Sequence, residues 1–150
     1  MGRLRQMVEA FPPALEQMMD MLGSRVCRSM RAHYKSYSHP YETGALYNSI
    51  RHETHTDDDL VTVYVFADAK SDDDIPYAEF LEYGTGKAHT GHGRDGYWFY
   101  KDRDGKWHMT DGMDAKPFIE PAVAEVMGDL NDLFADLEND IKKYKGWEHD

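Results

Sequence analysis

The fold is decided by the stretch Tyr77-Ala78-Glu79-Phe80-Leu81-Glu82-Tyr83-Gly84-Thr85. Its apolar pairs, Tyr77-Ala78 and Phe80-Leu81, are expected to anchor it in a core, and Gly84-Thr85 is expected to make the turn that leaves it. Glu82 is the acidic residue between the Phe80-Leu81 pair and the turn. On a helix Glu79 and Glu82 share a face, so a hydrolase with paired carboxylates stays open as an alternative.

A second motif precedes this stretch. It reads Thr43-Gly44-Ala45-Leu46-Tyr47-Asn48-Ser49-Ile50. Gly44 permits a tight change of direction, and the hydroxyls of Thr43 and Ser49 can cap exposed backbone amides. Leu46 and Ile50 are expected to anchor the segment in the core.

A third motif follows, and it opens the last helix. It reads Pro117-Phe118-Ile119-Glu120-Pro121-Ala122. Because proline is tolerated in a first helical turn, we expect the helix to begin at Pro117. From Ile119 to Ile141 apolar residues recur at helical spacing, with lysines near the end that complement the helix dipole. The pattern predicts one long C-terminal helix.

A long first helix is expected to begin at Pro12-Pro13. Apolar residues then recur at steps of three and four: Leu15, Met18, Met19, Leu22, Val26 and Met30. Gly23 weakens the middle of this helix and is a candidate bend. The lone Cys27 cannot form an internal disulfide and is expected to be a small buried group, which favours folding in a reducing cytoplasm.

Two β-hairpins are indicated between these helices. The first pairs Ile50 to Thr56 with Leu60 to Phe66 across an acidic triplet at 57–59. The second spans Arg94 to Thr110 and turns at Asp104-Gly105, a strong hairpin signal. We therefore predict an α+β fold: an antiparallel sheet of about four strands from two hairpins, packed by a long N-terminal and a long C-terminal helix.

The length and charge of the chain limit the classes of protein to consider. At 150 residues it is expected to be a single domain, with residues 1–11 and 146–150 flexible. No run of about 18 apolar residues predicts a membrane span, and charged residues interrupt the first ten, so no secretory signal is expected. The net charge of -11 comes from residues 51–150, because residues 1–50 hold six Lys/Arg against four Asp/Glu. This balance disfavours gripping nucleic acid through its phosphates.

The order and spacing of the three motifs resemble the small neck and tail-component proteins of long-tailed double-stranded DNA bacteriophages. The resemblance spans about Arg25 to Val126, and Tyr47 departs from it by standing where a charged or polar residue is common. It implies a structural virion protein that is not an enzyme and needs no cofactor. It further implies a homo-oligomeric ring at the neck, assembled in the host cytoplasm, which joins head to tail or terminates the tail tube. Its partners would be adjacent neck or tail-tube proteins, with DNA only as cargo in the lumen and no membrane.

Residues of the motifs and of the hairpins take roles under this interpretation. The structural motif residues are Thr43, Gly44, Leu46, Ser49, Ile50, Tyr77, Ala78, Glu82, Gly84, Thr85, Pro117, Phe118 and Pro121. The candidate subunit interface is Tyr64, Phe66, Tyr97, Trp98, Phe99, Tyr100 and Trp107, since a small domain cannot bury all these rings. The resemblance implies that Glu82 is a structural or subunit-contact carboxylate, satisfied by backbone amides or by a basic partner. No catalytic residue is assigned.

Two further alternatives stay open. His89 and His92 are separated by two residues, and His108 could supply a third ligand, so a metal-dependent hydrolase is one alternative. The other is an acidic regulatory protein that mimics DNA, which would need its carboxylates on one face.

Overall fold

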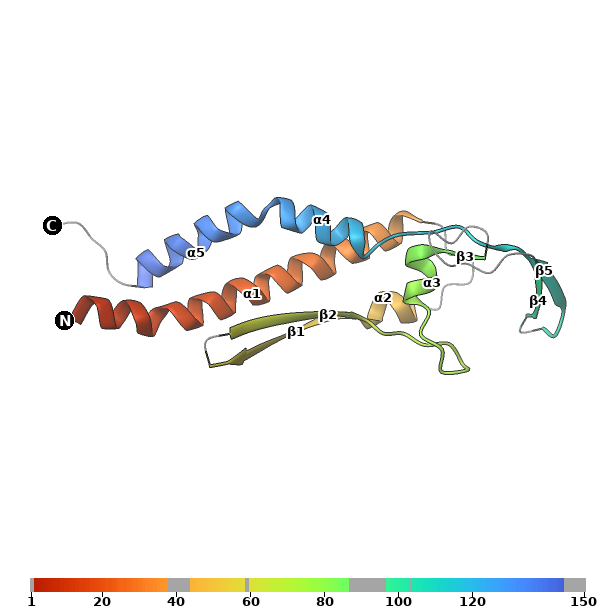
Figure 1. The fold of residues 1–150 in the computed structure, drawn as a ribbon, viewed down its shortest axis with the longest axis horizontal. Helices are drawn as coiled ribbons and strands as arrows, with labels where there is room; N and C mark the ends of the chain where they lie inside the picture. The colour runs from red at the N-terminus through yellow and green to blue at the C-terminus, as the bar shows by residue number, and fades with distance from the viewer. Residues whose placement is uncertain (1, 38–43, 59, 87–96, 103, 145–150) are drawn as a thin grey trace. The chain divides into compact units, whose positions relative to one another are not determined.

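The computed structural model describes residues 2–37, 44–58, 60–86, 97–102 and 104–144 (Figure 1). Its helices are α1 (Gly2–Ser36), α2 (Ala45–Ser49), α3 (Ala78–Tyr83), α4 (Glu120–Gly128) and α5 (Leu130–Tyr144). Its strands are β1 (Ile50–Asp57), β2 (Leu60–Ala67), β3 (Thr85–Gly86), β4 (Trp98–Lys101), β5 (Trp107–Thr110) and β6 (Gly112–Met113). The fold is therefore mixed α+β with a long N-terminal helix, as the sequence predicts.

Both predicted hairpins are present, but the predicted single sheet is confirmed only in part. Among the described residues, β1 pairs with β2, β4 with β5, and β3 with β6, each as a two-stranded sheet. The first turn contains Asp58 at φ 48°, and the second contains Gly105 at φ 79°, the left-handed conformation that an Asp-Gly turn supplies. The pair β3–β6 was not predicted, because two-residue strands carry no periodic signal.

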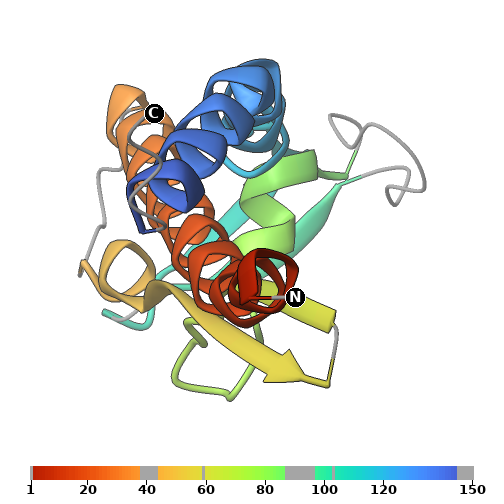
Figure 2. The same ribbon diagram turned by 90° about the vertical axis from the view of Figure 1, so that its left-hand side faces the viewer.

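Tertiary contacts divide the chain into two compact units, and the first comprises Met1–Ser29, Arg51–Phe66 and Ala122–Asp150. Within it the N-terminal part of α1 lies between the β1–β2 hairpin and helices α4 and α5 (Figures 1 and 2). Its buried apolar residues are Met18, Val26, Cys27, Ala122, Val126, Leu133 and Leu137. The hydroxyl of Ser29 donates to Glu125 Oε2 at 2.6 Å, which ties α1 to α4.

The second unit comprises Met30–Ile50 and Ala67–Pro121. Its buried apolar residues are Met30, Tyr34, Leu46, Ile50, Ala69, Ala78, Leu81 and Phe118. Every one of the three sequence motifs supplies at least one of them, so the motifs build the core of this unit. Both units are made of discontinuous segments, and the single domain expected from the length of the chain stays a prediction.

The start of the first helix differs from the prediction. Helix α1 begins at Gly2, and Pro12 and Pro13 lie inside it. Each proline removes one hydrogen bond to the residue four positions earlier, at a cost of roughly 3 kcal/mol in a helix interior. The preceding segment from Leu4 to Ala10 is rich in good helix formers, which favours continuation through the prolines.

The last helix also differs, because it starts later and is divided. Pro117 lies before α4, which begins at Glu120, and Asp129 separates α4 from α5. The amide of Asp129 donates to Val126 at 3.1 Å, three residues back, so the turn there is tighter than an α-helical one. Gly128 is a poor helix former, which explains why the helix is interrupted at this place.

Candidate functional site

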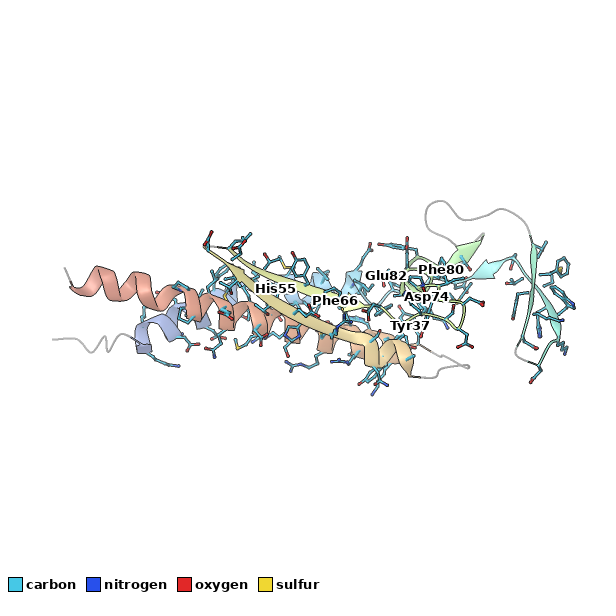
Figure 3. The ribbon with its side chains drawn as sticks, turned by 90° about the horizontal axis from the view of Figure 1, so that it is seen from below. Tyr37, His55, Phe66, Asp74, Phe80 and Glu82 are labelled. Carbon is cyan, nitrogen blue, oxygen red and sulfur yellow. The ribbon has the colours of Figure 1, made fainter. Side chains whose placement is uncertain are left out.

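Helix α3 carries the central residue of the site, Glu82. The amide of Leu81 donates to Tyr77 O at 3.3 Å in the first turn, and Gly84 ends the helix at φ 74°. This confirms Gly84 as the turn out of the motif. Glu82 is only 3% exposed, and Ala78 and Leu81 are buried beside it, whereas Phe80 is exposed and does not anchor the segment as predicted (Figure 3).

The carboxylate of Glu82 binds three consecutive backbone amides. Its Oε2 accepts the amides of Phe118 at 2.8 Å and Ile119 at 2.9 Å, and its Oε1 accepts that of Glu120 at 2.7 Å. These amides belong to the start of α4, where intrahelical partners are missing and the helix dipole favours a negative charge. The motif at 77–85 therefore caps the motif at 117–122, and backbone amides satisfy the carboxylate, which is one of the two arrangements that the resemblance implied.

Further contacts hold the same junction. The amide of Lys116 donates to Leu81 O at 2.7 Å, and the hydroxyl of Tyr83 donates to Glu120 Oε1 at 3.1 Å. The bond to Glu120 raises the pKa of Tyr83 above its ordinary value. Phe118 is fully buried and meets the ring of Tyr34 edge-on at 5.7 Å. Both oxygens of Glu82 are thus used inside a packed core, an arrangement that stabilises backbone.

The motif at 43–50 takes the predicted shape over the part of it that the structure describes. Gly44 has φ 75°, and Leu46 and Ile50 are fully buried. The hydroxyl of Ser49 accepts the amide of Ala69 at 3.2 Å and donates to Leu46 O at 2.8 Å, so it joins two segments. Thr43 lies outside the described residues.

Arg31 caps the end of α2. Its guanidinium donates to the carbonyl oxygens of Ile50 and of Tyr47, the latter at 3.5 Å. It also lies 5.7 Å from the centroid of the Tyr47 ring, and Lys35 Nζ lies 4.5 Å from the same centroid. The tyrosine that departs from the family pattern is therefore the surface on which two cations pack.

The short β3–β6 pair joins Thr85–Gly86 to Gly112–Met113. Thr85 Oγ1 accepts the amide of Met113 at 3.0 Å, and Gly86 lies opposite Gly112. A Cβ on Gly112 would lie 2.0 Å from Thr85 O, and the residue has φ 141°, so only glycine fits here.

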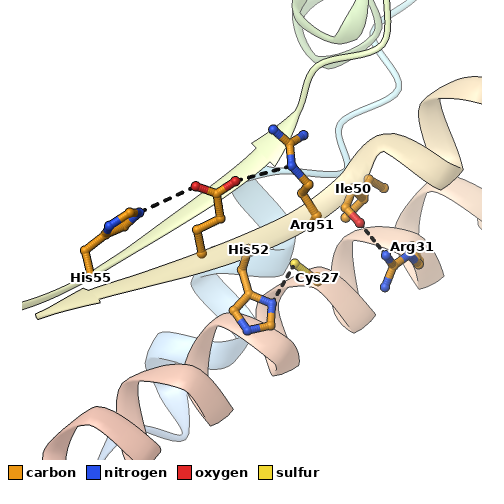
Figure 4. A network of polar contacts seen from close by, with 7 residues as sticks. Cys27, Arg31, Ile50, Arg51, His52 and His55 are labelled. Carbon is orange, nitrogen blue, oxygen red and sulfur yellow. Dashed lines mark hydrogen bonds and ion pairs between the residues drawn. The ribbon is translucent and has the colours of Figure 1, made fainter.

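On the outward face of the β1–β2 hairpin, Arg51 and His55 point away from α1 (Figure 4), and aromatic rings of β2 lie beside them. Glu53 lies between Arg51 at 3.6 Å and His55 at 3.5 Å. The guanidinium of Arg51 lies 4.5 Å from the centroid of Phe66, and the Tyr64 ring stacks on Phe66 at 6.3 Å. Tyr64 is exposed and Phe66 half-buried, so this part of the candidate interface is only partly open.

The β4–β5 hairpin leaves most of its candidate interface residues exposed. Tyr97, Phe99, Tyr100 and Trp107 are exposed, as is Met109, which was not predicted. Phe99 lies opposite Met109 and Lys101 opposite Trp107, so these four side chains share one face. The position of the Trp98 side chain lies outside what the structure describes.

An internal network around Asp102 fixes the turn of this hairpin. Asp102 Oδ1 accepts the amides of Asp104 at 3.0 Å and Lys106 at 2.8 Å, and Oδ2 lies 2.6 Å from His108 Nε2. The bond from His108 and then that from Lys106 hold the pKa of Asp102 below its ordinary value. The Tyr100 ring stacks on His108 with centroids 5.3 Å apart.

His108 is therefore already engaged, and the other two candidate metal ligands, His89 and His92, lie outside the described residues. Within the part of the chain that the structure describes, no group of three or more His, Cys, Asp or Glu side chains could hold a metal ion. No helix in that part is long and apolar enough to cross a membrane.

A polar cluster that the sequence did not predict joins β1 to α1 (Figure 4). His52 Nε2 lies 3.0 Å from Asp20 Oδ1, and His52 Nδ1 lies 3.9 Å from the thiol of Cys27. Thr54 Oγ1 donates to the same oxygen of Asp20 at 3.1 Å. Since Cys27 is 2% exposed, its thiol is enclosed, as the sequence predicts.

Gly23 makes room for this cluster. A Cβ at that position would lie 2.6 Å from Cδ2 and 2.9 Å from Cγ of His52. The glycine that we interpreted as a weak point or a bend is the place where an imidazole rests on the helix. Asp20, Gly23 and Cys27 are spaced by three and four residues, which is the only local signal of the cluster.

The chain was compared with models of protein families, with known proteins and with solved structures, and none of the three comparisons finds a match.

Proposed function

We propose that this chain is a structural protein of the phage neck, and that identical copies form a ring which joins the head to the tail or terminates the tail tube. The convergence at Glu82 carries the proposal. Two of the three motifs on which the resemblance rests, 77–85 and 117–122, are bound to one another through Glu82 and the amides of Phe118, Ile119 and Glu120. They hold the backbone of the second unit together, as residues of a structural family would.

The exposed rings support assembly of several copies. Soluble monomers seldom leave a contiguous set of large apolar side chains exposed, and such sets mark contacts with other proteins. The β4–β5 hairpin exposes Phe99, Trp107 and Met109 on one face, and the outward face of β1–β2 exposes Tyr64. We assign these surfaces to contacts with neighbouring copies or with adjacent neck and tail-tube proteins.

The predicted antiparallel sheet of about four strands is proposed to form when copies of the chain assemble. An isolated two-stranded hairpin is marginally stable in water, and strand edges with free hydrogen-bonding groups recruit further strands. We propose that β1, β2, β4 and β5 complete larger sheets in the assembled particle, under the long helices.

The acidic balance suits a conduit for DNA. Residues 51–116 carry eight Lys/Arg against fifteen Asp/Glu, and carboxylates that line a lumen repel phosphate. DNA would then be cargo that passes through, and the protein would reside in the virion after assembly in the host cytoplasm.

Electron cryo-microscopy of intact particles from the source phage tests the proposal. The expected result is a ring of density at the head–tail junction into which both compact units fit. Particles that are complete but lack this chain, shown by mass spectrometry of the purified virions, would exclude the structural role.

A further inference from the structure

Helices α4 and α5 carry more apolar surface than their own chain covers. One face is buried and consists of Ala122, Val126, Leu133 and Leu137. Beside it, Val123 and Met127 in α4 and Phe134 in α5 are exposed, the last two at 51% each. Each of the three directly follows a residue of that buried face, which is Ala122, Val126 or Leu133, so they flank it along one side. We call them the helix stripe.

The β4–β5 hairpin presents a second apolar surface. Phe99 and Trp107 are each 65% exposed and Met109 is 60% exposed, and cross-strand pairing puts them on one face. Lys101 lies on the same face, with its Nζ 5.6 Å from the centroid of the Trp107 ring. We call this set the hairpin face.

The two surfaces have complementary charge. Residues 97–110 contain three Lys/Arg against two Asp, a net charge of +1 in a chain of -11. Residues 120–144 contain seven Asp/Glu against two Lys, a net charge of -5. Among these acids, exposed Glu138 lies one helical turn beyond Phe134, on the side of the stripe. Contact between the two surfaces would join positive and negative segments, whereas contact between two helix stripes would join like charges.

We infer that the hairpin face of one copy docks on the helix stripe of the next copy. The inference rests on the proposed function, because it names the contact that builds the ring. The two surfaces differ, so the contact is head-to-tail, and head-to-tail contacts generate rings when the rotation closes. Apolar side chains then bury one another, and Lys101 approaches the carboxylates of α5.

The surface available is of the right size for such a contact. A fully buried aromatic side chain removes about 150–250 Å² from water, so the hairpin face offers on the order of 400 Å². One partner in a standard interface contributes about 800 Å², including a polar rim. The hairpin face therefore provides the apolar centre of an interface, and the flanking charged residues provide its rim.

Cysteine crosslinking of the purified full-length chain tests this contact. Met109→Cys and Met127→Cys are both exposed positions, one on each surface, and Cys27 is buried in the background. The double variant is treated with a short bis-maleimide at increasing concentration, up to on the order of 1 mM, where even weak contacts are populated. The expected result is a ladder of products at multiples of 17.4 kDa on a denaturing gel.

Control variants make the result specific. Met109→Cys with Asn139→Cys, an exposed position five residues after Phe134 and therefore on the far side of α5 from the helix stripe, should give no ladder. Each single variant should remain a monomer, and mixing the two single variants should give only a dimer. Lys101→Glu in the double variant should reduce the ladder several-fold.

Three results would overturn the inference. The first is no crosslinking at the highest concentration, and the second is crosslinking within one chain, which would place the hairpin on its own helices. The third is a ladder of equal strength from the Asn139→Cys control. A ring seen in the particles without the ladder would reject this contact and leave the proposed function standing.

Discussion

The carboxylate of Glu82 accepts the backbone amide of Phe118 at 2.8 Å, across 36 positions of sequence. Because the next two amides bind the same carboxylate, one side chain of α3 caps the segment at which α4 begins. Three hydrogen bonds to an ionised group in a buried site are individually stronger than neutral ones. The junction therefore makes the second unit sensitive to a single carboxylate.

Replacing that carboxylate by an amide should destabilise the fold. Glu82→Gln keeps the shape but removes the charge and one acceptor oxygen, leaving at least one buried amide unpaired. We expect a loss of about 2–3 kcal/mol in the free energy of unfolding, measured by urea denaturation followed by circular dichroism. Glu79→Gln, on the exposed side of the same helix, should change stability by less than about 0.5 kcal/mol. Equal effects of the two substitutions would contradict the assigned role of Glu82.

Two glycines should respond oppositely to alanine. Gly112→Ala places a Cβ against Thr85 O at a φ that only glycine tolerates, so a loss of about 2 kcal/mol or more is expected. Gly128→Ala meets nothing within 4 Å and removes backbone freedom from the unfolded chain, so a gain of about 0.4–1 kcal/mol is expected. Thermal unfolding of both variants checks the signs, and a stabilising Gly112→Ala would show that the β3–β6 pair is wrong.

The effect of Gly23→Ala should depend on His52. Alone, the substitution forces the imidazole away from Asp20 and is expected to cost about 1–2 kcal/mol. With His52→Ala the obstruction is gone, and the higher helix propensity of alanine should stabilise the protein by up to about 1 kcal/mol. A double-mutant cycle measures this change of sign. Additive effects would mean that the ring does not rest on Gly23.

Acid should weaken the polar contacts that join β1 to α1 through Asp20. The hydrogen bond from His52 and then that from Thr54 hold the pKa of Asp20 below its ordinary value of 3.8. A carboxyl with a lowered folded-state pKa contributes stability that is complete above 3.8 and disappears as the pH falls through the folded-state value. Urea midpoints measured from pH 5 downward should therefore fall less steeply for Asp20→Asn than for the natural chain. His52→Ala should remove the larger share of the same pH dependence, because Thr54 still donates to Asp20. A steeper fall in either variant would contradict the assignment.

The parts of the fold that local signals encode were predictable. The hairpin turn at Asp104-Gly105 and the strand from Leu60 to Phe66 depend on neighbouring residues, so their positions agree with the structure. The helix boundaries were not predictable to the residue. Pro12-Pro13 and Pro117 both resemble helix starts. However, α1 continues through Pro12-Pro13, and α4 starts after Pro117, at Glu120.

The sequence by itself determined the element types and the acidic balance, and its resemblance to a known family pointed to Glu82 as a structural or subunit-contact carboxylate. Only the tertiary structure decided what that carboxylate binds, that His52 rests on Gly23, and that Met109 joins Phe99 on an exposed face. The physical reason is the separation along the chain between the residues that interact. Turns, helix stripes and strand alternation arise between residues a few positions apart, whereas a cap 36 residues away or a ring on a helix exists only after distant segments have packed.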